Sequence, residues 1–65
     1  MSKLEAAKAA ARKAFRFEVV DKNFREAKIW WGVAYEKFKV VGDGKSSQIA
    51  RGKVDHCAIL DDEEE

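Results

Sequence analysis

A glycine-bracketed break, Gly42-Asp43-Gly44, constrains the fold of this chain more than any other feature. Glycine adopts backbone conformations that a side chain penalises, so this tripeptide should end the apolar run that reaches Val41. The hydroxyl of Ser46 or Ser47 can then cap the free amides of a new helix. The sequence therefore predicts a turn at residues 42–44 and a helix from Ser47 to Leu60.

Small residues recur at helical spacing in this predicted last helix. One face carries Ala50, Val54, Cys57 and Ala58, with Ile49 and Leu60 flanking it. We expect a helix with such a face to lie close to its support. Its first turn carries the positive end of the helix dipole beside Lys45 and Arg51, and a helix start of this kind attracts phosphate.

Length and composition bound the class of protein. Sixty-five residues make one small domain, and 46% hydrophobic with 38% charged residues is typical of a soluble globule. The single cysteine, Cys57, cannot form an internal disulfide, which favours a reducing, intracellular, cytoplasmic setting and a role as a small core residue. No run of about 18 apolar residues exists to span a membrane, and the charged N-terminus does not resemble a signal peptide.

Charge is distributed unevenly along the chain. The run from Asp61 to Glu65 holds five of the twelve acidic residues, which leaves seven against thirteen Lys and Arg in residues 1–60, a net of +6. We therefore expect one basic domain over residues 1–60, followed by an acidic C-terminal tail at residues 61–65. A basic body of this kind is consistent with a polyanionic partner.

The N-terminal half contains one helical pattern and one alternating pattern. The run from Lys3 to Phe15 is rich in strong helix formers. It places Leu4, Ala7, Ala11, Ala14 and Phe15 on one face. Residues 16–20 then alternate in the manner of a strand, and Asp21-Lys22-Asn23 marks a turn.

The aromatic segment between the two turns has two possible periods. Read as strands with a reversal near residues 36–37, it places Ile29, Trp31, Val33 and Tyr35 on one face and Trp30, Gly32 and Ala34 on the other. The competing interpretation is one long packing helix, indicated by two heptad rows, namely Phe17, Phe24, Trp31 and Phe38, and Val20, Ala27, Ala34 and Val41. We prefer the strands because residues 29–33 are poor in helix formers.

The C-terminal segment resembles the end of the double-stranded-RNA-binding domain. The resemblance rests on Gly42, Gly44, Ser46, Ser47-Gln48, Ala50, Arg51, Val54, Ala58 and Ile59, and extends in element order over about residues 3–60. It implies an α+β fold of order α-β-β-β-α, with two helices packed on one face of a three-stranded antiparallel sheet. Lys-Lys is usual in the family where this chain has Ser47-Gln48.

The resemblance also implies a ligand, double-stranded RNA, which this family recognises through phosphates and 2′-hydroxyls, independently of sequence. By position, Ser46, Ser47, Gln48 and Arg51 would form the contact region at the start of the last helix. Charge adds Lys45 and Lys53 to that region. Lys22 and Arg25 could take the place of the loop sequence that the family usually presents between its first two strands.

A second hypothesis is a domain of the same fold that binds a protein partner or self-associates, as an adaptor or inhibitor of a larger complex. Trp30 would be its anchor, because aromatic side chains dominate interface energetics. We expect no enzyme: His56 and Cys57 would point about 100° apart on a helix and do not pair as base and nucleophile. No second cysteine or histidine completes a zinc site, and no cofactor or metal is expected.

Overall fold

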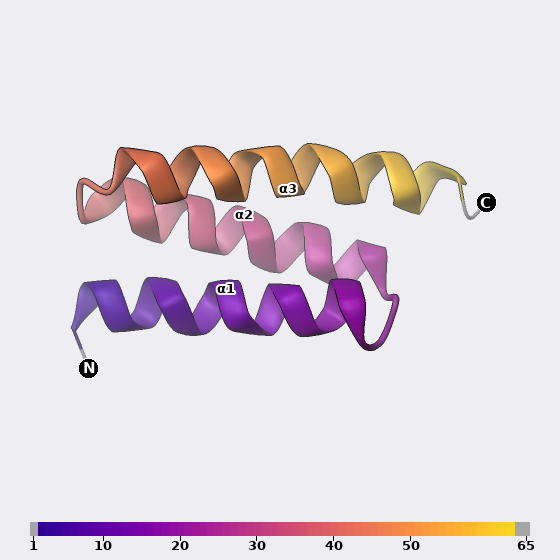
Figure 1. The fold of residues 1–65 in the computed structure, drawn as a ribbon, viewed down its shortest axis with the longest axis horizontal. Helices are drawn as coiled ribbons and strands as arrows, with labels where there is room; N and C mark the ends of the chain where they lie inside the picture. Colours follow the sequence, from indigo (N-terminus) through magenta and orange to yellow (C-terminus); the bar gives the residue numbers. More distant parts are fainter. Residues whose placement is uncertain (1, 64–65) are drawn as a thin grey trace.

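The computed structural model describes residues 2–63, which form three helices: α1 (Lys3–Val19), α2 (Phe24–Val40) and α3 (Gly44–Glu63) (Figure 1). Within this range there is no strand. The predicted α+β fold, with two helices on a three-stranded antiparallel sheet, is therefore wrong. None of the three helices is long and apolar enough to span a membrane.

The helices lie side by side in a layer with α2 in the middle. The Cα atoms extend over 37 × 19 × 12 Å, and α1 and α3 contact each other far less than either contacts α2. In Figure 1, α2 is drawn fainter than its neighbours and so lies farther from the viewer. The layer is therefore bent, with α1 and α3 rising on either side of α2.

Side-chain caps fix where each helix begins. Ser2 Oγ accepts a hydrogen bond from the Glu5 amide at 3.1 Å, and Asn23 Oδ1 accepts one from the Glu26 amide at 3.2 Å. These residues stand at the spacing of the capping box, with the acid three positions after the cap. The first helix was predicted from this region, and the structure confirms a helix that begins at Lys3.

Asp43 caps the third helix. Its Oδ1 accepts from the Ser46 amide at 3.1 Å, so α3 begins three residues earlier than the predicted Ser47. The hydrogen bonds from Ser46 lower the pKa of Asp43, and the charges of Lys45 and Lys8 lower it further. The predicted break is confirmed by Gly42, whose φ of 83° is accessible at low cost only to glycine.

The core of the layer is built largely from small side chains. Its buried members are Ala7, Ala10 and Ala14 of α1, Ala27, Trp31, Ala34 and Phe38 of α2, and Ser47, Ala50 and Cys57 of α3. Alanine allows helix axes to approach closely, which suits a thin layer. Cys57 is fully buried, as expected of a small core residue.

The strands predicted for residues 16–20 and 29–41 are the largest error. The heptad spacing holds within α2, where Ala27 and Ala34 are buried together, and so are Trp31 and Phe38. The one long helix that it indicated is also wrong, because the chain turns at residues 20–23, between α1 and α2. Burying one large apolar side chain contributes about 1.5–3 kcal/mol, whereas an unfavourable helix propensity costs at most about 0.7 kcal/mol for an ordinary residue. Packing of the aromatic stripe therefore outweighs the β preference of its neighbours.

The buried face of α1 also differs from the predicted one. Ala7 and Ala14 are buried as expected, but Ala10 is buried with them, whereas Leu4 and Phe15 remain 39% and 52% exposed. The three alanines pack in the core against α2, and the large apolar residues Leu4 and Phe15 stay largely exposed to solvent.

Candidate functional site

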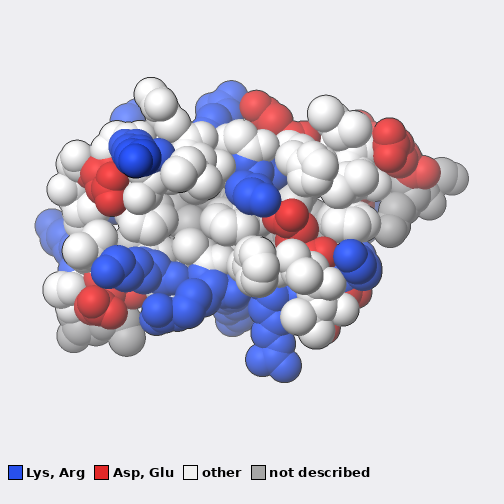
Figure 2. Space-filling view, in the orientation of Figure 1, with Lys and Arg blue, Asp and Glu red and all other residues white. Residues whose placement is uncertain are grey.

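An apolar groove lies between α1 and α3, with α2 as its floor. It has a volume of about 220 Å³ and is lined by Ala11, Trp31, Phe38, Ser46, Ile49 and Ala50. Figure 2 shows this side of the molecule, where uncharged side chains occupy much of the surface between α1 and α3 and a row of basic side chains follows α1. The groove follows from the bend of the layer, which keeps α1 and α3 apart above α2.

Large apolar side chains are exposed on the two helices that flank this groove. Leu4 lies seven residues before Ala11 and Phe15 four residues after it, so helical spacing places all three on one face of α1. On α3, Ile49 lines the groove and is 56% exposed. Trp31 and Phe38, one heptad apart on α2, are buried and provide an aromatic floor.

Glu18 links all three helices. Trp31 Nε1 donates to Glu18 Oε1 at 2.9 Å, and the Cys57 thiol donates to the same oxygen at 3.6 Å. Lys53 Nζ lies 3.6 Å from Glu18 Oε2, and the Glu18 side chain is mostly buried. Through these contacts one carboxylate joins α1 to α3 across α2.

Burial and, to a smaller extent, the nearby Glu18 carboxylate together raise the pKa of Cys57 to about 11. The thiol is therefore protonated at neutral pH, and a protonated thiol is a poor nucleophile. His56, its neighbour in sequence, is exposed on α3 while Cys57 is buried. The two side chains accordingly form no catalytic pair.

Trp30 occupies a different position from the one expected of an interface anchor. It is half-buried against the core, and the Lys13 ammonium lies 4.2 Å from the centroid of its ring. The predicted uncovered sheet face does not exist. A separate hollow beside it is lined by Arg12, Lys13, Arg16, Phe17 and Asp21, which makes this side of α1 basic.

The residues predicted to bind RNA at the start of the last helix do not share one surface. Lys45 and Gln48 are exposed, whereas Ser47 is buried and its hydroxyl donates to the Gly44 carbonyl at 2.9 Å. Ser46 lines the groove.

The two remaining basic residues of this predicted region are already paired. Arg51 lies 3.8 Å from Asp55 and 5.9 Å from the Tyr35 ring, and Lys53 pairs with Glu18. The predicted phosphate contacts of this region are thus divided between different sides of α3.

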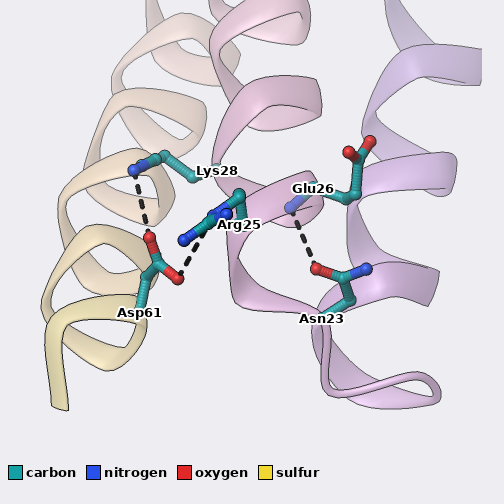
Figure 3. Close-up of polar contacts among 5 residues, drawn as sticks. All are labelled: Asn23, Arg25, Glu26, Lys28 and Asp61. Atoms are coloured by element: carbon teal, nitrogen blue, oxygen red, sulfur yellow. Dashed lines mark hydrogen bonds and ion pairs between the residues drawn. The ribbon is translucent and has the colours of Figure 1, made fainter. Parts of the chain in front are cut away.

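Lys22 and Arg25 lie at the other end of the molecule. Lys22 has a positive φ of 53° in the turn before α2, and Arg25 Nε lies 3.9 Å from Asp61. Lys28 Nζ reaches the same carboxylate at 3.4 Å (Figure 3). These basic residues therefore meet the C-terminal end of α3, and the structure does not bring them together with Lys45.

Asp61 to Glu63, the first part of the predicted acidic tail, belong to α3, and residues 64–65 lie outside the described range. Sequence reasoning missed Ala11, Glu18, Phe38 and Ile49 as site residues. The heptad spacing of Trp31 and Phe38 was the available signal for the floor. The sequence carries no comparable signal for the residues at the sides of the groove, because the positions of α1 and α3 relative to each other decide which residues lie there.

The described residues were examined for a metal site, and the sequence and structure were compared with known proteins. In residues 2–63 no group of three or more metal-binding side chains comes together. Comparisons with protein-family models, with curated proteins and with solved structures found no match to this chain.

Proposed function

We propose that this chain is a non-enzymatic protein-interaction module that binds one amphipathic helix in the groove between α1 and α3. The observation that carries the proposal is the groove itself, with a buried aromatic floor and the exposed Ile49 in its lining. Leu4 and Phe15 are exposed on the face of α1 that carries the groove residue Ala11. Recognition of an amphipathic helix by an apolar groove is a recurring mode of protein binding. The proposal retains the protein-binding hypothesis and replaces Trp30 by the groove.

The dimensions of the groove suit a short helix. A volume of about 220 Å³ accepts one or two large side chains of a partner. The face of α1 from Leu4 to Phe15 covers twelve residues, and its eleven intervals at 1.5 Å each give a length of about 16 Å, or about three turns of a helix. A partner helix of this length would cover the exposed apolar side chains and remove them from water.

Double-stranded RNA binding is less well supported. The resemblance placed its contact regions on a sheet-based fold, and that fold is wrong. The basic side of α1 remains, but solvated arginine and lysine are common on helical surfaces. The groove is the more specific feature because large apolar side chains around a hollow have no comparable role in a lone soluble domain.

Binding of a synthetic helical peptide tests the proposal. The probe is a dye-labelled amphipathic peptide of four turns, with leucine along one stripe and equal numbers of Glu and Lys elsewhere, used at low concentration in fluorescence anisotropy. We expect saturable binding that Ile49→Gln weakens about fivefold, equivalent to about 1 kcal/mol.

Ile29→Gln is the matched control. Ile29 is 51% exposed, close to the 56% of Ile49, but lies two residues from both Ala27 and Trp31 and so faces away from the buried side of α2. This variant should bind the peptide as the unmodified chain does. Equal weakening by both substitutions, or no saturable binding at all, would contradict the proposed function.

A further inference from the structure

Resting on the proposed function, we infer that the helix bound by this groove is acidic and belongs to a different chain. The groove provides apolar contact, and the charges around it select the partner. Three lysines, Lys8, Lys45 and Lys53, stand on the helices that form its walls. A partner helix with carboxylates beside its apolar stripe would match them.

Lys8 and Lys45 lie at the end of the groove nearest the turn between α2 and α3. Lys8 is three residues before Ala11 on α1, and Lys45 directly precedes Ser46 on α3, so each adjoins a groove residue. Both side chains are exposed, and both charges lower the pKa of Asp43 in that turn. Neither forms an ion pair with any residue in the range 2–63.

The carboxylates near the groove are already engaged. Glu18 accepts hydrogen bonds from Trp31 and Cys57 and pairs with Lys53. Asp43 caps α3 through the Ser46 amide. Lys8 and Lys45 have no such partner among residues 2–63, and their positive charges favour a negatively charged ligand.

A second copy of the chain fits the groove less well. Pairing two copies through this face would bring the same lysines together, and residues 1–60 carry a net charge of +6. Of the acidic side chains on α3, Asp61 is paired with Arg25 and Lys28, and Asp55 with Arg51. Among residues 2–63 this leaves Asp62 and Glu63 on α3, and both lie at its C-terminal end, whereas the groove residues Ser46, Ile49 and Ala50 lie near its start, so a face-to-face pair of copies would not place them beside Lys8 and Lys45. We therefore assign the acidic helix to a different chain.

Two labelled peptides test this inference. Both keep the leucine stripe of the neutral probe, one with Glu and the other with Lys at every remaining position. At low salt the Glu peptide should bind about tenfold tighter than the Lys peptide, and the difference should shrink at about 0.5 M NaCl because exposed charges are screened. The double variant Lys8→Glu/Lys45→Glu should reverse the preference.

The matched control is Lys3→Glu/Lys37→Glu. It makes the same change in net charge at two lysines that line a separate hollow with Val40, away from the groove. Circular dichroism spectra of all variants verify that the helices are retained. The control should still prefer the Glu peptide, with only a small loss from the altered net charge.

The alternative outcomes are distinguishable. Equal affinity for the two peptides, a preference for the Lys peptide, or equal effects of the two double variants would overturn the acidic partner and leave the groove as a helix site. Failure of every peptide to bind would overturn the proposed function as well. A dimer in sedimentation equilibrium that Ile49→Gln dissociates would place a second copy in the groove and also overturn the inference.

Discussion

The two ends of the helical layer differ in what lies between α1 and α3: polar contacts at one end and an apolar groove at the other. Near the first turn, Glu18 joins α1 to α3, and Asp61 joins α3 to α2. Near the second turn, the same space is an open groove lined mainly by apolar atoms. Polar contacts thus hold the helices together at one end. The exposed apolar side chains at the other end contribute little to the stability of the fold.

This difference teaches where stability and binding are located. A buried carboxylate with several partners holds the helices in a fixed arrangement, and the groove depends on that arrangement for its shape. Substitutions of Glu18 and Asp61, at the end with the polar contacts, should therefore lower the free energy of unfolding. Substitutions at the groove should change binding and leave stability nearly unaltered.

Removal of the Glu18 carboxylate should have the largest effect. Glu18→Ala leaves the Trp31 indole N–H and the Lys53 ammonium without their partner, and we expect a loss of about 2 kcal/mol in urea unfolding. Glu36→Ala, at an exposed position of α2, is the control and should cost less than about 0.5 kcal/mol. Similar losses in the free energy of unfolding for the two variants would show that Glu18 does not hold the helices together at this end.

Asp61→Asn should have a smaller effect at the same end. The carboxylate lies 3.4 Å from Lys28 and 3.9 Å from Arg25, and both cations are substantially exposed. Exposed ion pairs contribute about 0.2–1 kcal/mol and are screened by salt. We therefore expect a loss within that range at low ionic strength, measured by urea unfolding, which largely disappears at about 1 M NaCl. A loss that salt does not reduce would mean that Asp61 acts through packing instead.

Ala11→Leu should change stability least and binding most. The larger side chain enters the groove, where there is space for it, so the free energy of unfolding should move by less than about 0.5 kcal/mol. The same side chain occupies the place of the partner, and anisotropy should show at least about a tenfold weaker affinity for the neutral peptide. Ala9→Leu, at a half-buried position about 160° around α1 from Ala11, should leave peptide binding unchanged and alter stability by less than about 0.5 kcal/mol. Unaltered peptide binding by the Ala11→Leu variant would show that the peptide does not bind in the groove.

Part of the groove was accessible from the sequence and part was not. The seven-residue spacing of Trp31 and Phe38 places both aromatic side chains on one face of a helix, which is the floor of the groove. The strand interpretation was nevertheless preferred. Ala11 was placed on the correct side of the first helix, together with Leu4 and Phe15, but that side was expected to be buried. Helical periodicity groups residues on a face, and it does not say whether another helix covers that face.

The sequence by itself determined the local features: a helix beginning after Ser2, a turn at Asp21-Lys22-Asn23, a break at Gly42 and a last helix with Cys57 inside. Caps, glycine conformations and short-range spacing act between neighbours in the chain, so they can be read from it. The tertiary structure alone decided that residues 16–19 and 24–40 are helical, that the alanines of α1 pack against α2, and that a groove separates α1 from α3. Those outcomes depend on burial between distant segments, whose free energy exceeds the local preferences of the residues involved.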